Sequence, residues 1–247
     1  SSSNSTNLQP TGASLLCLSC HDGTIALGNV ISRTADISFS GGVTQMPAGG
    51  SNLTTDLSDD HPISFLYNSA LATADGQLKD PALVTQPVSM RDGYVQCTSC
   101  HDPHKNMYNN FLVVSNQFSE LCLKCHDRNY WGTSSHKTST STWNGTGSNP
   151  WLHTSYTNLA ENGCENCHNP HGSESKSLLM NYQAEESNCL VCHNGNVAST
   201  DIEGELVKSY LHNTYNYNLL HDPEENPLVT SMHVECEDCH NPHAVNN

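Results

Sequence analysis

Twelve cysteines, all arranged as C-x-x-C pairs that each precede a histidine, constrain this chain more than any other feature. The pairs are Cys17/Cys20, Cys97/Cys100, Cys122/Cys125, Cys164/Cys167, Cys189/Cys192 and Cys236/Cys239, followed by His21, His101, His126, His168, His193 and His240. Zinc ribbons have no need of a histidine after every pair, and redox C-x-x-C motifs occur singly. The pattern is typical of covalent haem attachment, in which two thiols bind the haem edge and the histidine binds iron. The sequence therefore predicts six covalently bound c-type haems.

The chain is too poor in apolar residues to build an ordinary core. Only 35% of its 247 residues are hydrophobic, and counting glycine still leaves it short of the roughly 45–50% of a typical domain. Six porphyrins would supply the missing apolar mass. We therefore expect one hexahaem unit over residues 1–247, mostly coil with short helices, whose core is a stacked chain of six haems. Helical turns are expected at the motifs, and long loops over residues 36–56 and 132–150.

The charge balance excludes some partners. A net charge of −16 disfavours contact with nucleic-acid phosphates. No apolar run approaches the roughly 20 residues that span a bilayer. We therefore expect neither nucleic-acid binding nor a membrane span.

The six motifs are of two types that alternate along the chain. First-type motifs read C-x-x-C-H-[DN]-P-H and begin at Cys97, Cys164 and Cys236. Second-type motifs have leucine after the first cysteine, lack the Pro-His, and begin at Cys17, Cys122 and Cys189. First- and second-type motifs 25 residues apart define two repeat pairs, 97–126 and 164–193, at an offset of 67. The motifs left over form half-pairs near the two ends, 14–21 and 236–243.

The two half-pairs could complete each other across two copies of the chain. Seventeen residues separate the motifs of each repeat pair, and the 16 residues before Cys17 plus the 4 after His243 give a similar linker. A head-to-tail contact of this kind builds an open filament when its rotation does not close. We favour this split pair; the alternative is that the half-pairs are independent sites of a monomer.

Nine histidines outside the motifs can supply the second axial ligand of each iron. They are His61, His104, His136, His153, His171, His212, His221, His233 and His243. Three of them, His104, His171 and His243, follow the proline of a first-type motif, where a stiff turn projects the ring toward a neighbouring haem. We assign His104 to the Cys122/Cys125 haem, His171 to the Cys189/Cys192 haem, and His243 to the Cys17/Cys20 haem of a neighbouring subunit.

The remaining distal ligands are expected ahead of the first-type motifs. We assign His61, His136 and His212 to the haems of Cys97, Cys164 and Cys236. His61 is the only histidine between His21 and Cys97. His153 competes with His136, and both His221 and His233 compete with His212. The five methionines have no recurring place, so methionine ligation is the weaker alternative.

The doubled unit resembles a known family. The run C-x-x-C-H-N-P-H-G-S at 164–173, then Leu178-Leu179 and a second motif, resembles the paired-C-x-x-C-H multihaem cytochromes c of metal-reducing bacteria. The resemblance covers about residues 14–247 and implies closely stacked haems, bis-histidine irons and electron transfer. The half-pair ends are similar to the extracellular hexahaem cytochromes that polymerise into conductive filaments. Because cytochrome c families receive haem outside the cytoplasmic membrane, the resemblance also implies export, with a removed signal, to the cell exterior or surface rather than the periplasm.

These observations predict an electron carrier without catalytic residues. We expect a filament subunit for long-range electron transfer, with copies of itself, redox proteins and extracellular acceptors as partners. One alternative is a monomeric periplasmic or surface shuttle. A multihaem reductase is less favoured, because catalysis needs an iron with an open position and histidine is abundant enough to fill every one.

Overall fold

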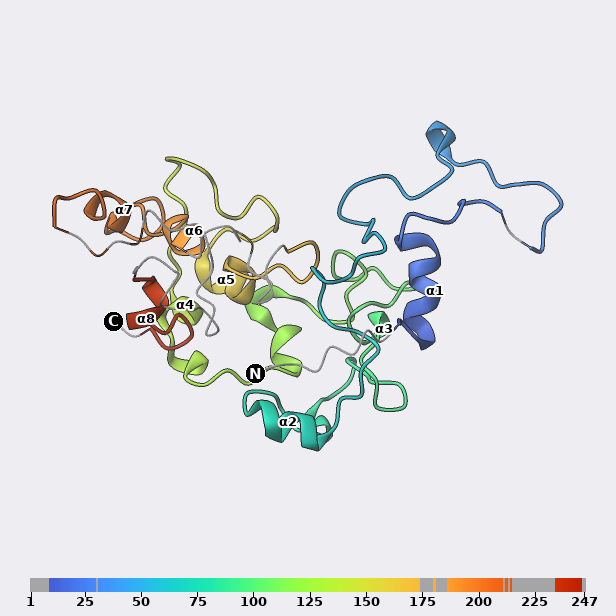
Figure 1. The fold of residues 1–247 in the computed structure, drawn as a ribbon, viewed down its shortest axis with the longest axis horizontal. Coiled ribbons are helices and arrows are strands. Elements are labelled where there is room, and N and C mark those ends of the chain that lie inside the picture. Colours follow the sequence, from blue (N-terminus) through green and yellow to red (C-terminus); the bar gives the residue numbers. More distant parts are fainter. Residues whose placement is uncertain are drawn as a thin grey trace, which may run out of the picture. The chain divides into compact units, whose positions relative to one another are not determined.

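The computed structural model describes residues 9–29, 31–173, 186–210 and 234–245, together with residues 180, 212 and 214. Short helices joined by long coil segments make up this part of the chain (Figure 1). Extended pairing within it is limited to isolated bridges, such as Leu66 with Tyr94. The prediction of mostly coil with short helices is therefore confirmed.

The α-helices are α1 (Gly12–His21), α2 (Ser69–Asp75), α3 (Cys97–Cys100), α4 (Ser135–Thr138), α5 (Leu159–Asn162), α6 (Glu186–Leu190), α7 (Ile202–Glu205) and α8 (Cys236–Cys239). The 3₁₀ turns are η1 (Ser40–Gly42), η2 (Pro81–Leu83), η3 (Gln117–Ser119), η4 (Cys122–Lys124), η5 (Trp131–Thr133) and η6 (Gly163–Asn166). The first cysteine of every motif lies in one of these elements, as predicted. The predicted loop over 36–56 contains only η1, whereas the one over 132–150 is partly wrong, because α4 forms there.

The second cysteine lies inside the helical element in only half of the motifs. Those inside are Cys20 in α1, Cys100 in α3 and Cys239 in α8; those beyond the end are Cys125 after η4, Cys167 after η6 and Cys192 after α6. The expected helical turn is therefore shorter than the motif in these last three cases. At η4 the Cys122 carbonyl accepts from the Cys125 amide over 3.2 Å and from the His126 amide over 2.9 Å. The shared acceptor tightens the turn, so it closes at Cys125 instead of continuing.

The chain divides into two compact units. The first comprises Ser1–Ser115 with Pro170–Gly172, and the second comprises Asn116–Asn169 with Ser173–Asn247. Residues Pro170–Gly172, which contain the Pro-His turn of the second repeat, thus belong to the first unit.

The protein core is thin in both units. Among the described residues, nine hydrophobic side chains are buried: Leu18, Tyr67, Ala72, Val88, Val95, Val114, Trp131, Trp151 and Ala160. Several of the most deeply buried side chains are instead polar, including Ser14, Ser119 and Asn162. Hydrogen bonds between motif segments therefore take a large share in fixing the fold.

Candidate haem-binding sites

The motifs share one local geometry. In five of them the amide of the histidine donates to the carbonyl of the first cysteine over 2.9 Å, for example His101 to Cys97 and His240 to Cys236. This is a single helical turn, which brings both thiols and the histidine to one side. The arrangement suits attachment of two thiols to one haem edge.

The cysteines predicted as haem tethers are all free thiols in this structure. Cys20 and Cys125, the second cysteines of the first and third motifs, are both half-buried, whereas Cys239 is exposed. The Sγ atom of Cys20 lies 4.0 Å from the Ser19 hydroxyl. A free thiol is the form that adds to a haem vinyl group, so the thioethers expected at Cys20 and Cys125 stay predictions, as they do at the other ten cysteines.

Several histidines are oriented by a hydrogen bond at Nδ1, which leaves Nε2 for a metal. The Nδ1 atoms of His21 and His101 lie 2.7 and 2.8 Å from the carbonyls of Ser51 and Asn110. That of His136 lies 2.9 Å from the carbonyl of Pro242. Such bonds fix the tautomer of a metal-binding imidazole and raise its basicity.

In the first unit, His171 lies opposite His101. The two ring centres are 6.1 Å apart. Metal–nitrogen bonds of about 2.0 Å, plus about 1.1 Å from each nitrogen to its ring centre, put two imidazoles on one iron about 6.2 Å apart. The separation therefore fits an iron held between these two rings.

In the second unit, two further ring pairs have the same separation. The centres of His168 and His243 are 6.2 Å apart with nearly parallel planes, and those of His136 and His193 are 6.1 Å apart. Trp131 packs edge-on against His243, with ring centres 6.3 Å apart. Each pair joins the histidine of one motif to a distal histidine predicted from the sequence.

These placements differ from the predicted pairings, which stay predictions. His171 faces the motif histidine of Cys97 rather than that of Cys189, and so takes the place expected for His61. His136 faces His193 rather than the motif histidine of Cys164. His243 lies beside His168 of its own chain, and its role at the Cys17/Cys20 haem of a neighbouring subunit stays a prediction. The residues expected as ligands do approach motif histidines, but not those of the haems to which the sequence assigns them.

His61 and His153 differ in how their rings are used. The Nδ1 atom of His61 lies 3.0 Å from the Pro62 carbonyl, and burial lowers the pKa of its ring. The Nε2 atom of His153 instead bonds to the Glu165 carbonyl over 2.9 Å. This hydrogen bond disfavours His153 as an iron ligand and favours its competitor His136.

The remaining predicted distal ligands lie at the surface or outside the described residues. The side chain of His104, expected at the Cys122/Cys125 haem, is 88% exposed, with Nδ1 3.2 Å from an Asp102 carboxylate oxygen. His212 is exposed coil. The positions of His221 and His233 lie outside the described residues.

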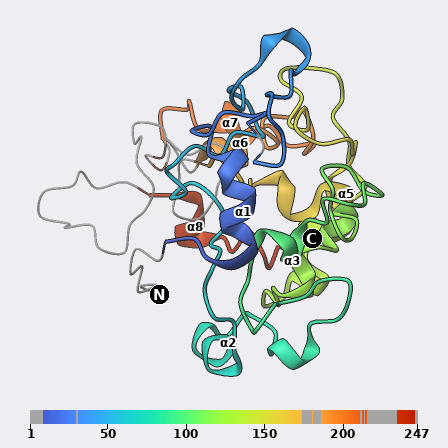
Figure 2. The same cartoon turned by 90° about the vertical axis from the view of Figure 1, so that its right-hand side faces the viewer.

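Each second-type motif packs against the first-type motif that follows it, whereas the repeat pairs predicted from the sequence join each first-type motif to the second-type motif that follows. In the first unit, α1 lies beside α3 (Figure 2). The Ser14 hydroxyl donates to the Gln96 side-chain oxygen over 2.6 Å and accepts from the Cys97 amide over 3.0 Å. The Gln96 oxygen also accepts from the Ser14 amide, so it caps the start of α1 from 82 residues away. The Cys17 and Cys97 side chains lie close enough to interact, and burial together with Cys97 raises the pKa of Cys17.

The second unit repeats this contact. Ser119 stands three residues before Cys122, as Ser14 stands before Cys17, and its hydroxyl accepts from the Cys164 amide over 2.7 Å. A side chain at Gly163, where φ is +53°, would place its Cβ 1.9 Å from this hydroxyl. The Cys122 and Cys164 thiols are hydrogen-bonded. A glycine is therefore required where the two motifs meet.

A third contact of this kind joins the Cys189 and Cys236 thiols. Buried Glu186 and Glu235 hold the positions that Ser14 and Gln96 hold in the first contact. Each second-type motif thus touches the first-type motif that follows it. The half-pairs at 14–21 and 236–243 therefore each contact another motif of the same chain, and their completion across two copies stays a prediction.

Burial governs the protonation of the site. It is the largest cause that lowers the pKa of His101 and of His193, and it lowers that of His243 to about 4. Burial also raises the pKa of the Cys167 thiol to about 12, whereas a hydrogen bond from Cys122 lowers that of Cys164 to about 7. The buried imidazoles are therefore neutral near pH 7, which is the form that binds a metal.

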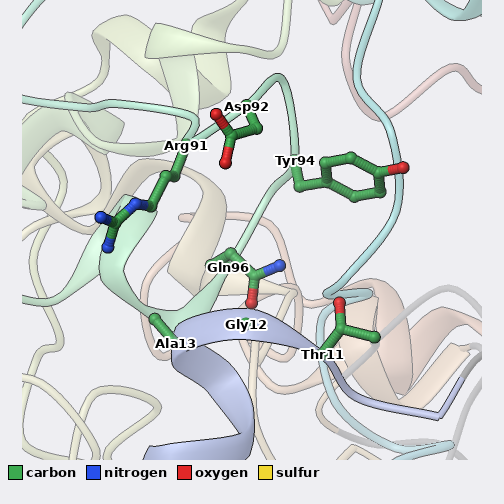
Figure 3. A pocket seen from close by; sticks show the side chains of 7 residues that line it. All are labelled: Thr11, Gly12, Ala13, Arg91, Asp92, Tyr94 and Gln96. Carbon is green, nitrogen blue, oxygen red and sulfur yellow. The ribbon is translucent and has the colours of Figure 1, made fainter.

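A surface hollow lies at the start of α1, lined by Thr11, Gly12, Ala13, Arg91, Asp92, Tyr94 and Gln96 (Figure 3). Gln96 points from it toward the first turn of α1. Its lining contains no cysteine or histidine, so this hollow is not where the motifs would hold haem. Within the described residues, no three His, Cys, Asp or Glu side chains converge as a zinc site requires.

The comparisons with known proteins agree with the chemistry of these motifs. A family described as the doubled CXXCH motif matches residues 86–129 and 157–198. The matches support a multihaem c-type cytochrome. They coincide with the two repeat pairs, whose C-x-x-C-H motifs imply covalently bound c-type haem. No curated protein matches the chain. None of the helices in the described segments is long and apolar enough to cross a membrane.

Proposed function

We propose that this chain is a hexahaem cytochrome that carries electrons along closely spaced, bis-histidine haems. The observation that carries the proposal is the set of three histidine pairs with ring centres 6.1–6.2 Å apart. Haem with two histidine ligands is a one-electron carrier whose potential is set by its ligands and surroundings. Because cysteines of consecutive motifs contact each other, the haems attached to them would lie close together.

The chain's own residues have separate roles in this function. The cysteines tether each haem, and the motif histidines bind its iron. His171, His136 and His243 fill the opposite positions at the haems of Cys97, Cys189 and Cys164. With both axial positions filled, an iron has no site for a substrate, so we assign no catalytic residue.

The direct test is the haem content and spin state of the exported, haem-loaded protein. We expect six haems per chain by pyridine haemochrome assay and mass spectrometry, all low-spin in the oxidised protein. Fewer than six covalent haems, or a substantial high-spin signal, would contradict the proposal. Turnover of nitrite or hydroxylamine by such an open iron would favour the reductase alternative.

A filament role is the finer part of the proposal, with His104 as the crossing ligand in place of His243. His171 and His243 both face the motif histidine of the preceding first-type motif. His104 belongs to the first of the three first-type motifs in residues 1–247, and His240 belongs to the last of them. His104 is exposed, as are His240 and Cys239 of the last first-type motif. We infer that His104 of one copy completes the Cys236/Cys239 haem of another, outside the cell, where such filaments reach external acceptors.

A monomeric shuttle is the second candidate, because all six motifs already contact another motif of the same chain. Electron microscopy and light scattering of the purified protein separate the two. Filaments that are lost in His104→Ala and kept in His153→Ala support the crossing ligand. Discrete single chains with six low-spin haems in the unaltered protein support the shuttle.

A further inference from the structure

Among the three histidine pairs of the described residues, one distal histidine has a buried carboxylate beside it. The histidine is His171 and the carboxylate is that of Asp60. The Asp60 Oδ1 atom is 2.7 Å from Nδ1 of His171, and the Asp60 side chain is only 6% exposed. Its second oxygen is buried with no hydrogen-bond partner in the described part of the chain. The carboxylate is therefore directed at this imidazole rather than shared with other donors.

The backbone holds this contact in place. The His61 amide donates to the Pro170 carbonyl over 2.8 Å, which ties the segment of Asp60 to the Pro-His turn. His171 in turn lies opposite His101, at the separation that an iron between them requires. The Asp60 carboxylate thus contacts the His171 ring, and that ring lies beside the position where an iron would bind.

Another distal histidine, His136 in the second unit, has a neutral acceptor instead. There the Nδ1 atom of His136 bonds to the Pro242 carbonyl over 2.9 Å. The carboxylate at His104 is different, because that histidine is 88% exposed and Asp102 is 33% exposed, so water screens the charge. The Asp60 carboxylate is buried, so water screens its charge much less.

We propose that Asp60 sets the potential of the Cys97/Cys100 haem below those of its neighbours, by acting through His171. This inference rests on the proposed function, since it requires His171 to be the distal ligand. A carboxylate that accepts the Nδ1–H bond of a metal-bound histidine makes the ring a stronger donor to the metal. A stronger donor and a buried negative charge both stabilise ferric iron, which carries one more positive charge than ferrous iron. The haem that Asp60 serves is therefore the last to accept an electron.

The test is Asp60→Asn in the haem-loaded protein, because asparagine keeps an acceptor for Nδ1 but removes the charge. We expect the oxidation equilibrium of one haem to shift about tenfold toward the reduced form, a rise of about 59 mV for a one-electron couple. The low-spin EPR signal of that haem should change with it. Asp102→Asn is the matched control, since it removes the same charge beside the same motif without touching His171.

Two outcomes would overturn the inference. One is a potential shift in Asp60→Asn no larger than in Asp102→Asn. The other is an undiminished Asp60→Asn shift in a His171→Ala background, because the carboxylate would then act without the ligand. Haem content and circular dichroism establish that each variant is folded. A fully low-spin His171→Ala protein would instead contradict the proposed ligand itself, which separates the two failures.

Discussion

His136→Ala tests whether His136, rather than His153, is an iron ligand. The ring of His136 lies 6.1 Å from that of His193, and its Nδ1 bonds to the Pro242 carbonyl. The substitution should therefore open one iron in six to water. Loss of the hydrogen bond should also lower the free energy of unfolding by about 1 kcal/mol.

The assay is quantitative EPR and near-infrared magnetic circular dichroism of the oxidised protein, referred to total haem. His136→Ala should convert one haem in six from low-spin to high-spin while all six stay attached. His153→Ala is the control, because the Nε2 of His153 is engaged by the Glu165 carbonyl. It should stay fully low-spin. A low-spin His136→Ala protein together with a high-spin His153→Ala protein would refute the reasoning.

Three further predictions concern the packing of the motifs. Gly163→Ala should lower the melting temperature, because φ is +53° and the new Cβ would overlap the Ser119 hydroxyl. The left-handed backbone conformation alone costs a residue with a side chain about 1–2 kcal/mol. An unchanged melting temperature would contradict this prediction. Ser14→Ala should cost about 1–3 kcal/mol in guanidinium unfolding, since it leaves buried polar groups unpaired. Ser19→Ala, at a half-buried serine whose hydroxyl donates to the Leu16 carbonyl, should cost less, about 0.5 kcal/mol. Acidification below pH 6.5 should destabilise the fold: burial lowers the pKa of His243 and a bound iron would also keep its ring unprotonated, so the unfolded chain binds a proton there that the folded chain does not. Unfolding at pH 7 and pH 5 should show this loss, and a smaller one in His243→Ala; equal stability at both pH values would count against it.

The sequence was sufficient for the local chemistry of the sites. The C-x-x-C-H spacing determines a single helical turn, because the histidine amide reaches the first cysteine carbonyl within it. The recurrence of Pro-His correctly drew attention to His171 and His243, which the structure places beside motif histidines. These features depend on neighbours in the sequence, so they could be predicted from it.

The pairing of motifs and ligands could not be predicted in the same way. The 25-residue spacing predicts partners that are close in sequence, whereas Cys17 contacts Cys97, 80 residues along the chain. One sequence feature does indicate the pairing of the motifs. Two second-type motifs have a serine three residues before their first cysteine, namely Ser14 and Ser119. Asp60 carried no signal, because an aspartate beside a histidine gives no hint of a ring 111 residues away.

Electron density for the haem-loaded protein, at a resolution that shows axial ligands, tests the central claim most directly. We predict one iron between His101 and His171, a second between His168 and His243, and a haem on each of the six motifs. A haem of Cys97/Cys100 whose iron is bound by His61, or any motif without a covalent haem, would contradict the account.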